Sequence, residues 1–146
     1  MSPNSKLDDL LRSKWRELGF FYIIDEEAHA WRLIGSKSGL NHFVAILRDY
    51  TEDESNFALS EHIHLGPYMY LEIGTWNQPV ITGHWIAGSM ADLKRLASII
   101  ETKLNENKTN IQYEISRDYA DNAEYQLIID VKDSDFDPVS LDPDLK

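Results

Sequence analysis

The chain has 146 residues, of which 42% are hydrophobic and 11% aromatic, so it can form one folded domain and is not intrinsically disordered. It contains no cysteine, which excludes disulfide bonds, thiolate metal sites, iron–sulfur clusters and a cysteine nucleophile. The formal net charge of −11, from 25 acidic and 14 basic residues, disfavours nucleic acid and anionic membranes as partners and favours a basic protein partner.

The first half of the chain predicts one helix and three strands. In residues 5–18 apolar side chains recur at helical spacing, and Gly19 follows at the position of a helix-terminating glycine. Residues 20–25 and 30–36 are rich in aromatic and β-branched residues and flank a short polar stretch, so they predict a hairpin. Residues 42–50 have a similar composition and are predicted to form a third strand.

The second half predicts four more strands and a second helix. Residues 51–66 form a long polar connection, of a kind that is often functional or contains a short element of its own. The helix spans residues 89–105, with Ser89 and Asp92 as a capping pair at its start. The strands are expected at residues 68–76, 80–88, 111–119 and 124–132, paired as two successive hairpins.

Together these elements predict an α+β fold, in which a single antiparallel sheet of about seven strands carries two helices packed on one face. Residues 1–132 form one domain, and no internal repeat or linker divides it. Residues 133–146 carry five aspartates and two prolines with little apolar pattern, so we expect an acidic extended tail. No apolar run reaches membrane-spanning length and no secretory signal opens the chain, so we expect a cytoplasmic protein.

Residues 68–76 provide the candidate binding surface. Their alternation places Met69, Leu71 and Ile73 on the core side of the strand. The opposite side carries the aromatic and acidic residues Tyr68, Tyr70, Glu72 and Trp76. If this side is uncovered, its rings are of the kind enriched at interfaces. If the N-terminal helix or the tail covers it, the rings form a second small core.

His62 and His64 are the candidate metal ligands. Two residues apart in an extended segment, they project to the same side, and Glu72 and His84 would supply further ligands if the two strands that carry them pair. Imidazole and carboxylate ligands suit zinc or a related divalent ion. An H-x-H pair without a third ligand at a diagnostic spacing is more often a pair of histidines with ordinary hydrogen bonds, so we expect no metal and no other cofactor.

No sequence motif indicates another catalytic site. The chain lacks the G-x-S-x-G nucleophile elbow and both common glycine-rich phosphate loops. Ser89, which follows Gly88 at the start of the second helix, fits an N-cap better than an anion site. An enzymatic function is therefore the less favoured interpretation.

The segment 70–104 resembles part of a known group of proteins. It contains a strand that ends in I-x-G-S and a helix with L-x-x-L-A, formed by Ile86, Gly88, Ser89, Leu93, Leu96 and Ala97. This pattern is similar to the I-x-G-[ST]…L-x-x-L-A element of some small bacterial immunity proteins, which neutralise toxins delivered between competing bacteria. The resemblance covers about a quarter of the chain and implies a small cytosolic bacterial protein that binds another protein. It assigns no functional residue, because the matched positions are structural.

The favoured function is that of a non-enzymatic protein-binding module, an immunity-type inhibitor that occludes a basic toxin surface. Aromatic residues would supply buried anchors, and acidic residues would steer the encounter. The residues expected to bind the partner are Tyr68, Tyr70, Glu72, Trp76, Glu52, Asp53 and Glu54. There are two alternatives: a small-ligand-binding or regulatory domain with a pocket between sheet and helix, and a small metal-dependent hydrolase that uses His62, His64 and Glu72. The sequence predicts no oligomeric state.

Overall fold

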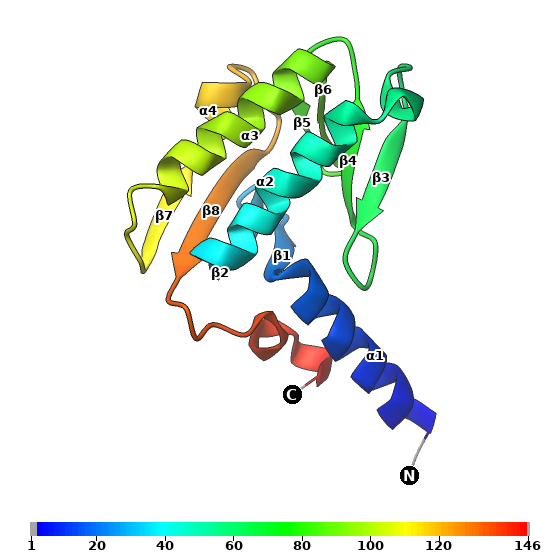
Figure 1. The fold of residues 1–146 in the computed structure, drawn as a ribbon, viewed down its shortest axis with the longest axis vertical. Helices are drawn as coiled ribbons and strands as arrows, with labels where there is room; N and C mark the ends of the chain where they lie inside the picture. The colour runs from blue at the N-terminus through cyan, green and yellow to red at the C-terminus, as the bar shows by residue number, and fades with distance from the viewer. Residues whose placement is uncertain (1–2, 146) are drawn as a thin grey trace.

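Residues 3–145 are described by the computed structural model and form an α+β fold with two sheets (Figure 1). The α-helices are α1 (Pro3–Leu18), α2 (Lys37–Glu52), α3 (Met90–Leu104) and α4 (Ser116–Tyr119). The strands are β1 (Phe20–Asp25), β2 (Ala30–Ser36), β3 (His62–Leu65), β4 (Leu71–Thr75), β5 (Val80–Ile81), β6 (Trp85–Gly88), β7 (Ile111–Glu114) and β8 (Gln126–Lys132). The predicted α+β class is confirmed. The single antiparallel sheet of seven strands is wrong, because the strands form two mixed four-stranded sheets in the orders β1-β2-β8-β7 and β3-β4-β6-β5.

Each sheet is built around one parallel pair of strands. β2 pairs in parallel with β8, and β4 pairs in parallel with β6, while the outer pairs are antiparallel. The chain therefore contains the order ββαββ twice, with α2 in the first unit and α3 in the second, and each unit contributes one hairpin to each sheet. No repeat is predicted from the sequence, in which the clearest trace of this structural repeat is the Gly-Ser pair before each helix, Gly35-Ser36 and Gly88-Ser89.

Helix α2 occupies the segment 42–50 for which a strand is predicted from composition. Ser36 caps the start of α2 by accepting a hydrogen bond from the backbone N–H of Gly39 at 3.1 Å. The buried residues of α2 recur at helical spacing and are Leu40, Phe43, Val44, Leu47, Tyr50 and Thr51. The aromatic and β-branched side chains of this segment favour a strand. The helical spacing of the buried residues nevertheless continues from the cap to the end of the segment, and burial of this apolar stripe determines that the segment is a helix.

Three other predicted strands are shorter than expected. β4 begins only at Leu71, because Met69 adopts a left-handed backbone with a φ of 61° that ends the predicted alternation. The predicted strand 80–88 is divided into β5 and β6, and β7 gives way to the short helix α4. The predicted hairpin between the strands now seen as β4 and β6 is wrong because they run parallel, whereas the β7–β8 hairpin is confirmed.

Helices α2 and α3 lie side by side and cover the same face of the two sheets (Figure 1). Arg48 of α2 donates two hydrogen bonds to the carboxylate of Glu101 on α3, at 2.8 and 2.9 Å. The second helix on this face is therefore α2 and not the predicted N-terminal helix. Within residues 3–145, every helix is too short or too polar to cross a lipid bilayer.

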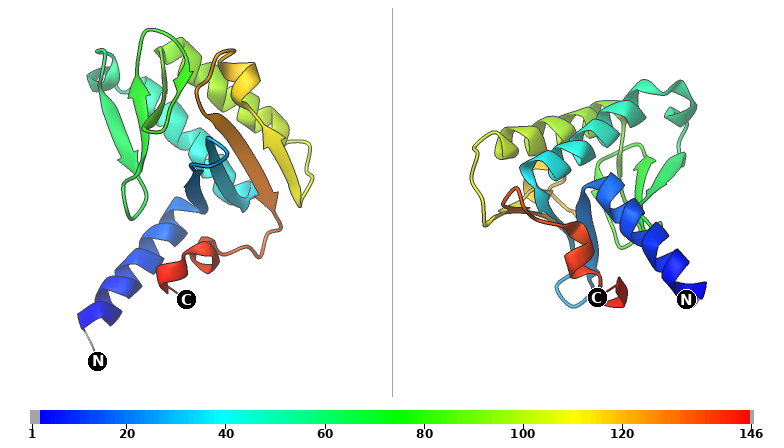
Figure 2. Two further views of the ribbon diagram at one scale, coloured as in Figure 1. Left: turned by 180° about the vertical axis from the view of Figure 1, so that it is seen from behind. Right: turned by 60° about the horizontal axis from the view of Figure 1, so that its bottom comes forward.

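Helix α1 points away from the two sheets, and the C-terminal residues fold back against it (Figure 2, right). They form the short 3-10 helices η2 (Pro138–Leu141) and η3 (Pro143–Leu145) instead of the extended tail predicted for residues 133–146. An aspartate followed by a proline begins each one, which is the arrangement of an N-cap followed by a proline at the first helical position. Val139 and Leu145 are buried by this packing.

The end of α1 packs closely against the start of α2. Gly19 ends α1 as predicted, with a φ of 89° and a hydrogen bond from its N–H to the carbonyl of Trp15 at 3.0 Å. Gly39 lies directly against Gly19, so that a Cβ atom at residue 39 would overlap the carbonyl oxygen of Gly19. The two glycines therefore allow the two backbones to touch.

Replacing Gly39 with alanine is expected to lower the free energy of unfolding by about 1–3 kcal/mol, because the methyl group forces the two helix ends apart. Alanine is favoured over glycine inside a helix by about 1 kcal/mol, so helix propensity alone would raise the free energy of unfolding. A lower free energy of unfolding would therefore report the steric clash. Urea denaturation measures the change. Ser38→Ala is the control, since Ser38 is exposed in the same turn. Equal stability of the two variants would contradict the close approach.

Candidate functional site

A pocket of about 620 Å³ lies between β1, the loop from β3 to β4 and the C-terminal 3-10 helices. Its lining residues come from α1, β1, β2 and the turn between them, the loop after β3 and the start of β4, the loop after β5, and the C-terminal segment, and none comes from α2 or α3. Figure 2 (left) shows these strands and loops from the side that α2 and α3 do not cover. A pocket of this volume suits a small organic ligand.

Aromatic rings form most of the wall of the pocket. β1 is apolar on both faces: Phe20 packs against Phe43 of α2, with ring centroids 5.5 Å apart, while Phe21 packs against Trp15 of α1 at 4.7 Å. The rings that line the pocket are Trp15, Phe21, Tyr22, Trp31, Tyr68 and Tyr70. The pocket is therefore a direct consequence of a strand that buries apolar side chains on both sides, one toward the helices and one toward α1 and the tail.

Hydrogen bonds hold several of these rings in place. The hydroxyl of Tyr22 donates to the carbonyl of Leu65 at 2.7 Å and accepts from the backbone N–H of Tyr70 at 3.2 Å. The indole N–H of Trp31 donates to the carbonyl of Thr82 at 2.7 Å. Burial raises the pKa of the Tyr22 hydroxyl, so it stays protonated at neutral pH. The wall is thus preorganised, since the bonds link both sheets across the pocket.

A buried carboxylate, Asp142, lies at the C-terminal side of the pocket. One of its oxygens, Oδ2, accepts hydrogen bonds from the indole N–H of Trp15 at 2.9 Å and from the hydroxyl of Tyr68 at 2.7 Å. Its other oxygen accepts from the backbone N–H of Asp144 at 2.9 Å. Burial by itself would raise the pKa of Asp142, but these hydrogen bonds outweigh it and bring the pKa below its ordinary value. Asp142 is therefore ionised at neutral pH.

The charge of Asp142 has no basic partner within residues 3–145, where none of the ion pairs involves it. Asp142 is only 2% exposed. Three further carboxylates line the pocket, those of Glu26, Glu72 and Asp144, and among residues 3–145 no lysine or arginine lines it. Burial and the neighbouring Asp142 also raise the pKa of Tyr68, which stays protonated. The pocket is therefore aromatic and negatively charged.

The structure separates the residues predicted to bind a partner. Tyr68, Tyr70 and Glu72 line the pocket, and the rings of Tyr68 and Tyr70 stack with centroids 5.9 Å apart. Tyr68 and Tyr70 belong to a loop and not to the predicted strand. Trp76 lies apart from them and packs on the ring of Trp85 at 5.9 Å.

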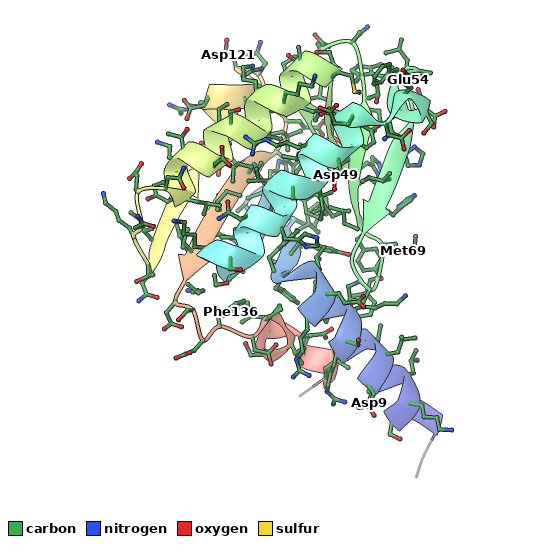
Figure 3. All side chains as sticks on the ribbon, viewed as in Figure 1. Asp9, Asp49, Glu54, Met69, Asp121 and Phe136 are labelled. Carbon is green, nitrogen blue, oxygen red and sulfur yellow. The ribbon has the colours of Figure 1, made fainter. Side chains whose placement is uncertain are left out.

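The predicted acidic residues lie elsewhere. Glu52 is the last residue of α2, and Asp53 caps and Glu54 begins the short 3-10 helix η1 (Glu54–Asn56). Figure 3 shows Glu54 near one end of β3 and Met69 near the other, and none of the three acidic residues lines the pocket. The side chain of Asp53 accepts hydrogen bonds from the N–H and the hydroxyl of Ser55, which lower its pKa. Asp53 therefore stabilises the local turn. The acidic residues at the end of α2 and the tyrosines of the pocket do not form one continuous surface.

The structure brings His62, His64 and Glu72 together. In the antiparallel pair β3–β4, His64 lies opposite Glu72 and His62 lies opposite Gly74. The Nε2 atom of His62 is 3.6 Å from a carboxylate oxygen of Glu72, and the two imidazole centroids are 5.1 Å apart. His84, the other ligand suggested from the sequence, lines the pocket and is not part of this cluster.

Sequence reasoning missed Trp15, Trp31 and Asp142 as parts of a site. Two signals were present in the chain. The strand sequence FFYIID is apolar at successive positions, which is typical of a strand covered on both faces and not of an open antiparallel sheet. The repeated Asp-Pro pair in residues 137–143 indicates capped turns and not an extended tail.

Comparisons with protein family models, with curated proteins and with solved structures found no match. The function of the chain is therefore inferred from its own residues and their geometry.

Proposed function

We propose that the chain is a binding protein whose ligand is a small organic cation with an aromatic or aliphatic body, held in the aromatic pocket. The observation that carries this proposal is the buried, ionised carboxylate of Asp142, which hydrogen bonds satisfy but no basic side chain of residues 3–145 neutralises. Buried charges in proteins are normally paired, because transfer of an isolated ion out of water is costly. A bound cation would supply the missing charge.

The walls of the pocket favour the same class of ligand. A cation near the face of an aromatic ring is attracted by the negative face of the ring, and the attraction strengthens as water is excluded. Carboxylates on the other lining residues, Glu26, Glu72 and Asp144, would repel an anionic ligand. The apolar body of the ligand would bury its surface against Tyr22 and Trp31, whose rings are held by hydrogen bonds.

The proposal is tested with two probes of similar size and opposite charge, 2-phenylethylammonium and 3-phenylpropionate. Trp15 and Trp31 line the pocket, so tryptophan fluorescence reports binding directly. The ammonium probe is expected to change the emission in a saturable way and to raise the melting temperature, because a ligand that binds only the folded state stabilises it. The carboxylate probe is expected to do neither.

Two variants place the binding in the pocket. Glu72→Gln and Tyr70→Ala are each expected to weaken binding of the ammonium probe by about tenfold, equal to 1.4 kcal/mol. Phe57→Ala is the control, since Phe57 is an exposed aromatic residue outside the pocket. Equal binding of both probes, or unchanged binding in both pocket variants, would overturn the proposal.

A second candidate function is binding of a basic protein partner, such as the toxin domain suggested by the resemblance to immunity proteins. It is supported by the exposed apolar residues at the edge of the pocket, Met69 at 56% and Tyr70 at 68% exposed. A lysine or arginine side chain of the partner would then enter the pocket as the cation, with these residues packed around it. Binding of a lysine-containing peptide in place of the free amine would favour this function.

A further inference from the structure

We propose that His62, His64 and Glu72 form a binding site for one divalent transition metal ion, with zinc as the best fit. No metal is predicted from the sequence, because the H-x-H pair lacks a third ligand at a diagnostic spacing. The register of β3 against β4 supplies that third ligand, since Glu72 lies directly opposite His64. This inference does not depend on the proposed ligand of the pocket.

All three side chains project from the same face of the hairpin. His62 and His64 are two residues apart on β3, and residues that lie opposite each other in an antiparallel pair point to the same side. The residues on either side of Glu72 in β4, Leu71 and Ile73, point to the opposite face of the hairpin, which is the core side, and both are fully buried. The two histidines remain exposed to solvent, so an ion has access to them.

Backbone hydrogen bonds orient both imidazole rings for metal binding. The Nδ1 atom of His62 is 2.9 Å from the carbonyl oxygen of Ser60, and the Nδ1 atom of His64 is 3.0 Å from the carbonyl oxygen of Met69. A carbonyl oxygen can only accept, so Nδ1 carries the hydrogen in each ring and donates it. The lone pair of each neutral ring is then on Nε2. This arrangement, in which one ring nitrogen donates to a carbonyl and the other is left for the ion, is typical of metal-binding histidines.

The two carbonyl groups that orient the rings come from residues with unusual backbone conformations. Ser60 has a φ of 74° and Met69 a φ of 61°, both in the left-handed region that residues other than glycine seldom adopt. Such conformations persist only where the surrounding structure holds them. They place one acceptor beside each histidine, one before β3 and one after it.

The ligand set and its spacing fit zinc. Candidate ligand atoms of the three residues all lie within 4.8 Å of one another. Around a tetrahedral zinc ion, nitrogen and oxygen ligands lie about 2.0–2.2 Å from the metal and so roughly 3–3.5 Å from each other. Small side-chain rotations would bring the three ligand atoms to these distances. Two imidazoles and one carboxylate leave a fourth position for water or another ligand, as in zinc sites with three protein ligands. Because Glu72 also lines the pocket, the ion would lie at the edge of the pocket.

The site is tested on the full chain after removal of metal with a chelator. Titration calorimetry with zinc chloride is expected to give one zinc ion per chain. Cobalt chloride is expected to give the intense visible absorption of a tetrahedral cobalt site, and zinc is expected to abolish that absorption by displacement. His62→Ala and His64→Ala are each expected to lose stoichiometric binding, and Glu72→Gln to weaken it by about tenfold or more.

Two control variants separate this site from the rest of the molecule. His29→Ala removes an exposed imidazole outside the cluster and is expected to bind zinc as the unmodified chain does. Tyr70→Ala alters the pocket without touching a ligand and is also expected to keep zinc binding, so failure of the pocket proposal leaves the metal result unaffected. Circular dichroism verifies that each variant is folded. Absence of stoichiometric zinc binding, or its persistence in the His62→Ala/His64→Ala double variant, would overturn the proposal.

Discussion

Replacing Phe43 with alanine is expected to lower the free energy of unfolding by about 3–5 kcal/mol. Phe43 is fully buried on α2, and its ring packs edge-on against that of Phe20 on β1, with centroids 5.5 Å apart. Truncation removes the transfer free energy of the ring and leaves a cavity between α2 and β1 that the packed neighbours cannot fill. Urea denaturation, monitored by circular dichroism, measures the change.

The matched control for this prediction is Asp49→Ala, an exposed position on the same helix that is expected to have little effect. The comparison also tests the helix itself. A strand over residues 42–50 would place residue 49 on the same face as residue 43, whereas in the helix it points to solvent. Comparable losses in the two variants would contradict the helical assignment of this segment.

The second large effect is expected for Asp142→Asn, which should lower the free energy of unfolding by about 1.5–3 kcal/mol at neutral pH. The substitution keeps the size of the side chain and removes the charge. Charged acceptors form stronger hydrogen bonds, and Trp15 and Tyr68 both donate to this carboxylate. If the amide oxygen of asparagine takes the place of Oδ2, its amide nitrogen faces the backbone N–H of Asp144, from which it cannot accept a hydrogen bond. Asp144→Asn, at the neighbouring exposed position, is the control.

The contribution of Asp142 is expected to depend on pH. The pKa of the folded carboxyl group lies below its ordinary value, so the ionised form stabilises the folded state. That contribution is fully present above the ordinary pKa of about 4 and is lost as the pH falls through the lower pKa of the folded state. The difference in unfolding free energy between the unmodified chain and Asp142→Asn should therefore shrink from about pH 6 to about pH 3. A difference that stays constant over this range would show that Asp142 is not a charged acceptor in the folded state.

Local patterns in the sequence determined the ends of helices and the general class of the fold. The capping box at the start of α3 is present as predicted, with Ser89 and Asp92 each accepting from the backbone N–H of the other at 3.1 and 3.0 Å. Gly19 ends α1 as predicted. These features depend on residues three or four positions apart, which interact in the same way whatever the rest of the chain does. The β1–β2 hairpin was predictable for a similar reason, because a short turn joins its strands, whereas β7 and β8 pair across the intervening helix α4.

Residues 42–50 were misread because two local signals disagreed. Phe43, Val44 and Ile46 favour a strand by intrinsic preference, whereas the spacing of Leu40, Phe43, Leu47 and Tyr50 favours a helix. Preferences of single residues are small compared with the burial of a whole apolar stripe against β1, β2 and α3. Packing therefore decided the outcome.

Only the tertiary structure decided how the hairpins join and where the candidate sites lie. The parallel pair β2–β8 joins segments from the two ends of the chain, which carry no sequence signal for each other. The segments of β4 and β6 are close in the sequence, but their composition does not distinguish the observed parallel pairing from the predicted antiparallel hairpin. The hydrogen bond between Trp15 and Asp142 spans 127 positions, so no local pattern could place both residues in one pocket. The alternation of β3 was enough to predict that His62 and His64 share a side. A shift of one residue in the pairing would have turned Glu72 to the opposite face, and only the register of the folded hairpin brings its carboxylate to the two histidines.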